Sequence, residues 1–352
     1  MKILAVNSGS TSTKLAVYDN ETLTWRESIY HSREELSAFR EINDQYEYRL
    51  KSVLSCLEKA GVSISFDAVV ARGGLLHPMP GGVYLIDEHV LHDLWNAGRH
   101  HASNLAAPVA AYIASKSGCP AYFADSVVTD EFRDEARISG LPEIPRASIF
   151  HALNSRAVSR QYASSIGRRY EDLCIIVAHL GGGITVSAHE RGRVVDCNNA
   201  IDGDGAFTPE RTGSLPAIPL VDLCFSGRYT REQLHKKLIG HGGLMAHLGT
   251  TDVATIVRWA NAGNAKHRLV LDAMLYDVSK QIGSMHAALR CRTDAVIVTG
   301  GIAYSDYCVG KIREWAGGIA PIVVIPGEDE MRALAMNALG VLRGKLELKR
   351  YS

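Results

Sequence analysis

Three stretches of the sequence combine glycine with side chains that can hydrogen-bond an anion, and each directly follows a short apolar run. They are NSGSTSTK (Asn7–Lys14), HLGGG (His179–Gly183) and TGGIAYS (Thr299–Ser305). Glycine lets the backbone approach a ligand without a Cβ clash, and N–H groups that converge in a turn bind anions. Each stretch alone could be an ordinary solvated loop. Three together favour a site that holds the phosphates and ribose of one nucleotide.

The sequence lacks the two commonest nucleotide-binding motifs. No GxxxxGK[ST] occurs, and no GxGxxG opens a helix. The pattern therefore supports neither a P-loop nor a Rossmann dinucleotide site.

Two arginines lie in glycine- and proline-rich surroundings. Arg72 precedes Gly73 and Gly74, and Arg211 lies within TPERTGS at 208–214. The guanidinium fork binds carboxylate and phosphate in a bidentate manner and keeps its charge, so both are candidates to bind an anionic substrate. The alternative is that each is a surface arginine paired with a nearby acid.

Three further side chains could do chemistry. His151 begins a predicted helix, His179 opens the second glycine turn, and Asp125 ends a predicted strand. A histidine at a helix start is often only structural, and His179 could equally cap its strand. The other histidines lack a metal-binding spacing such as HExxH.

Alternating strands and helices must position these residues. Short apolar runs predict strands at 3–6, 15–18, 68–71, 83–86 and 121–123, and helical spacing predicts helices at 33–60, 109–116, 151–169 and 328–343. The stretch 173–196 repeats the opening layout of strand, glycine turn and strand. We therefore predict an α/β fold of two related halves, 1–148 and 149–327, with the C-terminal helix of 328–352 packing on the first.

Composition narrows the function classes. The 352 residues are enough for two domains, and 38 basic residues balance 38 acidic ones, so we expect neither nucleic acid nor a membrane as a partner. Seven scattered cysteines form no CxxC pair, which is typical of a reducing compartment. The sequence shows neither a signal-peptide core nor an apolar run of membrane-spanning length. We expect a cytoplasmic protein.

The three glycine stretches together resemble the acetate kinase family, a branch of the actin, Hsp70 and sugar kinase superfamily. Four further stretches are similar to its butyrate kinase subgroup: ARGGLLHPMPGGVY (71–84), ARISGLPEI (136–144), FTPERTGSLP (207–216) and PGEDEM (326–331). The resemblance covers nearly the whole chain and is weakest at 20–66. It implies two ribonuclease H-like domains of the actin-like ATPase type with a central interdomain cleft, and by default a homodimer.

The resemblance also implies roles for individual residues. Catalytic roles fall on Arg72, Arg211, His151 and Asp125. Contacts with ATP or ADP fall on Asn7, Gly9, Ser10, Thr11, Ser12, Lys14, His179, Gly181, Gly182, Gly183, Gly300, Gly301 and Ile302, of which the last three would contact adenosine. Asp125 and one acid of 328–330 would organise Mg²⁺, and we choose Glu330. Acids at a helix start are also favoured by the helix dipole alone. His100 could lie near the substrate.

The implied reaction is phosphorylation of butyrate by ATP to give butanoyl phosphate and ADP. A short-chain acid has a pKa of about 4 to 5, so it is already an anionic nucleophile at neutral pH and needs no general base. Isobutyrate, acetate and propionate are alternative substrates. A sugar kinase of the same superfamily would instead use Asp125 as a base, and a nucleotide-switch protein is a remote alternative. Gly73 and Gly74 are expected to leave space for the longer acyl chain.

Overall fold

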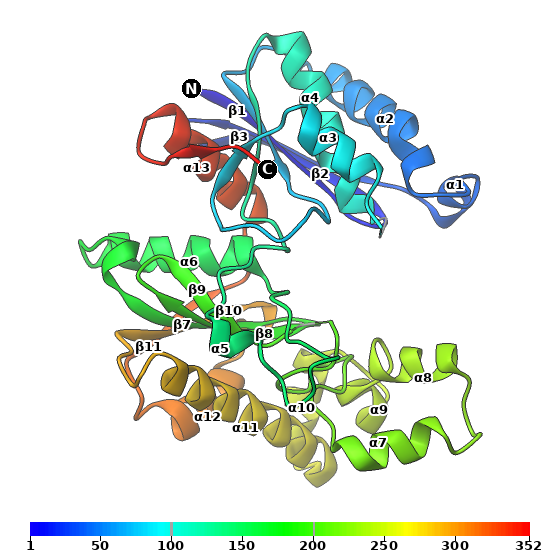
Figure 1. Cartoon of the computed structure of the whole chain (residues 1–352), viewed down its shortest axis with the longest axis vertical. Coiled ribbons are helices and arrows are strands. Elements are labelled where there is room, and N and C mark those ends of the chain that lie inside the picture. Colours follow the sequence, from blue (N-terminus) through cyan, green and yellow to red (C-terminus); the bar gives the residue numbers. More distant parts are fainter. Residues whose placement is uncertain (99–100, 200) are drawn as a thin grey trace. The chain divides into compact units, whose positions relative to one another are not determined.

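Two β-sheets organise the chain, which is described at residues 1–98, 101–199 and 201–352 of a computed structural model (Figure 1). Each sheet belongs to one of two units. The first unit combines Met1–Thr129 with Asp329–Ser352, and the second is Asp130–Glu328. The predicted boundary at residue 148 differs from this division, because the segment after Asp130 bonds within the second unit: the N–H of Arg133 donates to the carbonyl of Val195.

The first unit contains a seven-stranded sheet in the order β12-β5-β6-β4-β1-β2-β3. Its strands are β1 (Lys2–Ser8), β2 (Ser12–Asp19), β3 (Thr22–Tyr30), β4 (Ala68–Arg72), β5 (Val83–Leu85), β6 (Ala121–Ala124) and β12 (Leu348–Lys349). β1, β2 and β3 form antiparallel hairpins, whereas β4 runs parallel to β1 and β6 runs parallel to β4. The run from Ile3 to Val6 is fully buried, as expected of a strand covered on both faces.

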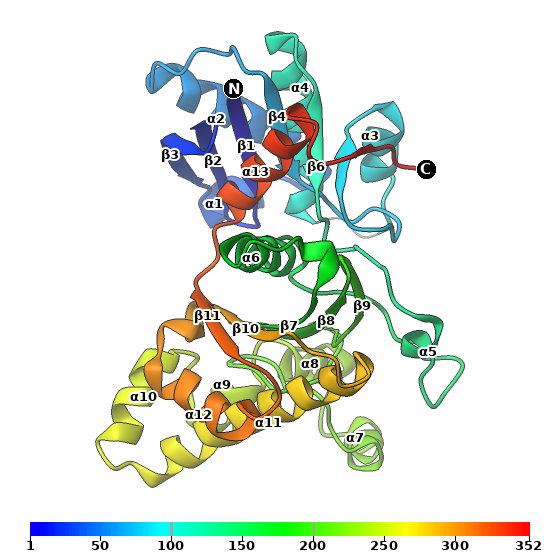
Figure 2. The ribbon, with the colours of Figure 1, turned by 90° about the vertical axis from the view of Figure 1, so that its left-hand side faces the viewer.

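Helices cover both faces of this sheet. They are α1 (Arg33–Ser37), α2 (Tyr46–Lys59), α3 (Glu88–Trp95), α4 (Ala106–Ser117) and α13 (Glu330–Leu342), with short 3₁₀ turns η1 (Asn43–Gln45) and η2 (Ala102–Leu105). Figures 1 and 2 show α13 on one side of the strands and α2 and α4 on the other. The C-terminal helix contacts β1, β4 and β6, so the end of the chain completes the unit that its beginning started.

The helix predicted over 33–60 is wrong in its middle. The structure has α1 and α2 with a turn between them. There, the carboxylate of Asp44 accepts a hydrogen bond of 3.0 Å from the N–H of Glu41. A side chain that satisfies the backbone locally competes with the helical hydrogen bonds.

The second unit repeats the order of five strands of the first unit, β6-β4-β1-β2-β3. Its five-stranded sheet runs β11-β10-β7-β8-β9. The strands are β7 (Cys174–Leu180), β8 (Ile184–Glu190), β9 (Arg193–Cys197), β10 (Ala295–Gly300) and β11 (Ile322–Pro326). β7, β8 and β9 are antiparallel, as β1, β2 and β3 are, while β10 and β11 continue in parallel from β7. The predicted repeat of strand, glycine turn and strand is confirmed.

The side chains of β7 alternate between two apolar clusters. Ile176 and Ala178 pack with Val278 of the long helix α11, while Ile175 and Val177 pack with the opposite cluster that contains α6 residues. The helices of this unit are α5 (Asp134–Arg137), α6 (Ala152–Ser165), α7 (Ala217–Cys224), α8 (Arg231–Leu238), α9 (Gly243–Leu248), α10 (Val253–Asn261), α11 (Ala265–Ala288) and α12 (Asp306–Ala316), with 3₁₀ turns η3 (Tyr170–Asp172) and η4 (Gly301–Tyr304). None of the described helices has the length and apolar character that a membrane crossing needs.

Candidate functional site

The first glycine turn is the tip of the β1–β2 hairpin. Asn7 pairs with Lys14 and Ser8 with Thr13, and the N–H of Gly9 donates to the carbonyl of Ser12 at 2.8 Å. The hairpin therefore brings together the phosphate-binding candidates of this stretch, which are Asn7, Gly9, Ser10, Thr11, Ser12 and Lys14. Ser10 and Thr11 are exposed at the tip.

Three candidates from distant parts of the sequence meet beside this hairpin. Glu330 at the start of α13 accepts a hydrogen bond of 2.6 Å from the Asn7 amide through Oε2. Its other oxygen, Oε1, lies 2.9 Å from Nη1 of Arg72, which ends β4. Neighbouring strands β1 and β4 position Asn7 and Arg72, and α13 packs on both.

Asp125 lies just beyond the end of β6 in an unusual backbone conformation. Its φ of 41° is in the left-handed region, where residues other than glycine are uncommon and strain is often stored at functional sites. The residue is only 3% exposed. Its carboxylate accepts from the N–H of Gly82 at 2.9 Å and from the amide of Asn337 on α13 at 3.3 Å. These bonds fix the direction in which the carboxylate points.

The expectation that Gly73 and Gly74 leave open space is wrong. A Cβ on Gly74 would lie 2.6 Å from Oδ1 of Asn104 and 2.7 Å from Cδ2 of Leu94. A Cβ on Gly73 would lie 2.8 Å from Cβ of Ser126. Neighbouring side chains already fill the volume beside the two glycines. The glycines therefore allow the backbone after Arg72 to pack closely against these side chains.

In the second unit, Arg211 is packed against the second glycine turn. A Cβ on Gly183 would lie 2.6 Å from Nη1 of Arg211, so a larger residue would displace the guanidinium from this position. The hydroxyl of Thr208 donates to the carbonyl of Gly182 at 2.7 Å and accepts from the N–H of Arg211 at 3.0 Å. Thr208 therefore ties the arginine loop to the turn of Gly181, Gly182 and Gly183.

His151 and His179 are stacked, with ring centroids 3.8 Å apart and planes inclined by 8°. Burial lowers the pKa of His179 to about 4, so its ring is neutral at pH 7. The side-chain amide of Asn154 lies 2.9 Å from Nδ1 of His179. An amide N–H can only donate, so Nδ1 accepts and Nε2 carries the hydrogen. That Nε2 lies 3.5 Å from Glu328, while Nδ1 of His151 lies 2.9 Å from the Thr185 hydroxyl.

The third glycine turn begins at the end of β10 and is hydrogen-bonded to the residue that follows β11. Gly300 and Gly327 exchange two backbone hydrogen bonds of 3.1 and 2.9 Å. Gly300 has a φ of 87°, and a Cβ there would collide with the carbonyl of Leu180. Gly301 and Ile302 follow at the start of η4. Asn154 also donates to the hydroxyl of Thr299 at 3.3 Å and so connects the second turn with the third.

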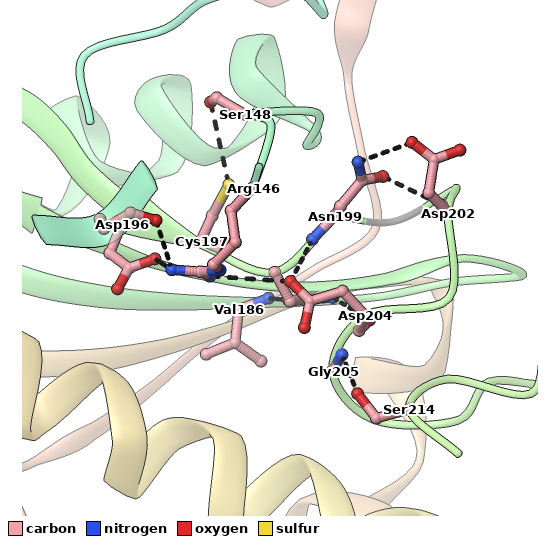
Figure 3. A network of polar contacts seen from close by, with 12 residues as sticks. Arg146, Ser148, Val186, Asp196, Cys197, Asn199, Asp202, Asp204, Gly205 and Ser214 are labelled. Carbon is pink, nitrogen blue, oxygen red and sulfur yellow. Dashed lines mark hydrogen bonds and ion pairs between the residues drawn. The ribbon is translucent and has the colours of Figure 1, made fainter. Parts of the chain in front are cut away.

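A polar network supports the loop that leads to Arg211 (Figure 3). Arg146 lies 2.9 Å from Asp196 of β9 and 3.6 Å from Asp204. The carboxylate of Asp204 accepts from the N–H of Asn199 at 3.1 Å, and the N–H of Gly205 donates to Ser214 at 2.9 Å. Burial raises the pKa of Asp196, with the charge of Arg146 opposing this effect. The network fixes both ends of the segment that contains Arg211.

The structure therefore groups the predicted residues within each unit. Asn7–Lys14, Arg72, Asp125 and Glu330 lie in the first unit, and His151, His179, Gly181–Gly183, Arg211 and Gly300–Ile302 lie in the second. His100 lies outside the described residues. Sequence reasoning missed Arg49, Asn104, Asn154 and Arg146. Arg49 had a usable signal, because it precedes Val53 and Leu57 at helical spacing on the buried face of α2.

Known proteins are similar to this chain over its whole length. A sequence model of the acetokinase family matches residues 145–313. A protein of Phocaeicola vulgatus named "Probable butyrate kinase" is 56% identical over 100% of this chain and 99% of its own length. "Butyrate kinase 2" of Clostridium acetobutylicum is 48% identical over 99% of both chains.

Solved structures show the same fold at low sequence identity. The crystal structure of Porphyromonas gingivalis acetate kinase matches with a TM-score of 0.76 and 18% identity, over 97% of this chain and 99% of that one. A propionate kinase from Francisella tularensis matches with a TM-score of 0.74 and 17% identity, over 96% of this chain and 98% of that one. The predicted α/β fold class, with two halves of the actin-like ATPase type, is confirmed.

Proposed function

Because the chain belongs to the acetokinase family, we propose that it phosphorylates butyrate with ATP, giving butanoyl phosphate and ADP. The observation that carries this substrate assignment is the sequence identity of 48–56%, over the whole length of the chain, to proteins named as butyrate kinases. We also propose a cytoplasmic homodimer, as expected from the sequence.

The reaction needs positive charge more than it needs a base. At neutral pH the acid is already ionised, and the barrier comes largely from bringing a carboxylate to a polyphosphate. We assign Arg72 and Arg211 to this task, since a guanidinium can bind the carboxylate or the transferring phosphoryl group with two parallel hydrogen bonds. The fixed positions of Arg72 beside Glu330 and of Arg211 over Gly183 support this assignment. Preorganised donors lower the barrier because they need not reorient.

The neutral ring of His179 would act as a hydrogen-bond donor. Its low pKa and the contact of Nδ1 with Asn154 leave a hydrogen on Nε2. We propose that this N–H binds a phosphate oxygen and that stacked His151 stabilises the transferring group. Nucleotide contacts from Asn7, Gly9–Ser12, Lys14, Gly181–Gly183 and Gly300–Ile302 remain part of the proposal.

The carboxylates of the first unit fit Mg²⁺. This ion prefers oxygen ligands, keeps several waters and takes one or two protein carboxylates, and Asp125 and Glu330 supply such oxygens. Glu330 contacts Asn7 and Arg72, whereas Glu328 contacts His179, and this supports Glu330 among the three acids of 328–330. When bound, Mg²⁺ would neutralise part of the phosphate charge.

Hydroxamate trapping tests the proposed reaction directly. Acyl phosphate formed from ATP and acetate, propionate, butyrate or isobutyrate is captured at matched acid concentrations. Two additional buried methylenes contribute about 1.6 kcal/mol, so kcat/KM for butyrate should exceed that for acetate by roughly 15-fold. A preference for acetate or isobutyrate would overturn the assignment of butyrate, and no hydroxamate from any of the four acids would overturn the reaction.

A further inference from the structure

A buried arginine lies directly behind the first glycine turn. Arg49 of α2 is completely inaccessible to solvent. Its Nη1 donates to the carbonyl of Gly9 and its Nη2 to the carbonyl of Ser10, both at 2.9 Å. Nη1 also lies 3.3 Å from the hydroxyl of Thr13, and Nε donates to Oε1 of Gln45 at 3.0 Å. The guanidinium therefore contacts the turn along two consecutive peptide groups.

These contacts determine which way the turn presents its N–H groups. In a trans peptide the carbonyl and the following N–H point in opposite directions. Since the carbonyls of Gly9 and Ser10 point toward Arg49, the N–H groups of Ser10 and Thr11 point away from it. An anion on the exposed side of the turn would meet both donors.

Arg49 also lacks an acidic partner among the described residues. Its neighbours are carbonyl oxygens, a hydroxyl and a neutral amide. A buried charge without a counter-ion is destabilising, and burial lowers the pKa of the guanidinium. Arginine nevertheless keeps its proton in proteins, so the turn is backed by a full positive charge. A polyanion bound to the turn would supply the missing counter-charge.

We propose that Arg49 is a positioning residue for the phosphates of ATP. It holds the two carbonyls inward so that the N–H groups face the phosphates, and its buried charge attracts them through the turn. This inference rests on the proposed function, in which the turn binds ATP. The competing explanation is that Arg49 only ties α2 to the β1–β2 hairpin.

Gln45→Glu separates these two explanations. A carboxylate at this position keeps a hydrogen-bond acceptor for Nε of Arg49 but adds a counter-charge beside it. If Arg49 were only structural, the new ion pair would leave nucleotide binding unchanged. If its charge attracts phosphates, the variant should bind ATP more weakly although it folds normally. Arg49→Lys tests the fork itself, because an ammonium cannot hold both carbonyls in the same geometry.

The experiment measures dissociation constants of ATP, ADP, AMP and adenosine by calorimetry at fixed magnesium concentration, together with the KM for butyrate. In Gln45→Glu and Arg49→Lys, ATP and ADP should bind about tenfold more weakly, the scale of a hydrogen bond to a charged group. Adenosine binding and the KM for butyrate should stay within about twofold of wild type. Arg156→Lys is the matched control, since Arg156 is a buried arginine of the second unit that is paired with Glu131 at 3.1 Å.

The outcomes distinguish this inference from the proposed function. If the wild type does not bind ATP, the proposed function fails. If it binds ATP and both variants bind it equally well, or lose adenosine to the same extent, the role of Arg49 is overturned. Thermal unfolding of each variant shows whether it folds, and Gln45→Glu still gives a result if Arg49→Lys does not fold.

Discussion

The guanidinium of Arg211 lies against the backbone of Gly183, with Nη1 only 2.6 Å from the position that a Cβ would take. The relationship joins the second glycine turn to the arginine loop, although the two are 28 positions apart in the sequence. A larger residue at 183 would displace the guanidinium, and this is the reason for glycine there, because Gly183 does not have a positive φ.

Gly183→Ala should reduce turnover without unfolding the protein. The new methyl group would displace Arg211 and misplace a donor to the transition state, for which we expect a loss of roughly 10²-fold in kcat. Gly310→Ala on α12 is the matched control, because no atom lies within 4 Å of its added Cβ and the proposed site does not include this residue. Steady-state kinetics on both variants checks this, and equal activities would show that Arg211 does not depend on Gly183.

Arg72→Ala should lower kcat by roughly 10²–10³-fold, the scale of losing one transition-state donor. Arg72→Lys should remain poor, because a single ammonium cannot replace the fork that contacts Glu330 at 2.9 Å. Arg228→Ala, at an exposed position of the second unit, serves as a control for loss of charge. Near-wild-type kcat in Arg72→Ala would remove this arginine from the proposed site.

The free energy of unfolding should fall as the pH falls from about 6.5 toward 4. Burial lowers the pKa of His31 to about 4, of His179 to about 4 and of His189 to about 3. Below pH 6.5 the unfolded chain binds protons that the folded protein does not, so acid favours unfolding. This contribution levels off once the pH is below the folded-state pKa values.

Urea unfolding between pH 4.5 and 7.5 measures this dependence. His189→Gln removes one titrating group and should make the free energy of unfolding depend less steeply on pH, whatever its effect on stability at pH 7. As a control, His235→Gln changes a histidine on a basic, largely exposed helix and should leave the slope as it is. A wild-type stability that is constant across this range would contradict the prediction.

Gly74→Ala should destabilise the protein and should not change its choice of acid. Its methyl group would collide with Asn104 and Leu94, and overpacking of this kind lowers the free energy of unfolding by about 1–3 kcal/mol. Activity on butyrate and on acetate should fall by the same factor. Gly140→Ala is the control, since no atom lies within 4 Å of the added Cβ. A selective loss of butyrate activity would restore Gly74 as a determinant of chain length.

Local sequence patterns predicted most of the helices and strands. Which residues pack against each of them depends on tertiary contacts that these patterns do not reveal. The β1–β2 hairpin and its turn follow from two apolar runs and a glycine between them, and these could be identified from the sequence. Whether the space beside Gly74 is filled depends on Asn104, which lies on a separate segment of the chain. Likewise, helical spacing indicates that Arg49 is buried, but its partners Gly9 and Ser10 are about 40 residues away.

In the candidate site, too, the sequence predicted positions along the strands but not the contacts between distant segments. The strand ends at Asn7 and Arg72 were predicted, and parallel pairing of β1 with β4 places them at the same edge. The resemblance already favoured Glu330, but its contacts with Asn7 and Arg72 depend on the position of α13 on that sheet, which no local pattern fixes. Asn154 resembles any polar residue of a helix until α6 is packed beside β7.

The position of α13 determines when the first unit can be completed during synthesis. Residues 1–129 are made first, yet the face of β1, β4 and β6 that α13 covers stays open until Asp329–Ser352 have been made. Glu330, the partner of Asn7 and Arg72, is also missing until then. The second unit is continuous in the sequence, so all of its residues have been made before α13 exists. The half of the protein that is begun first is therefore finished last.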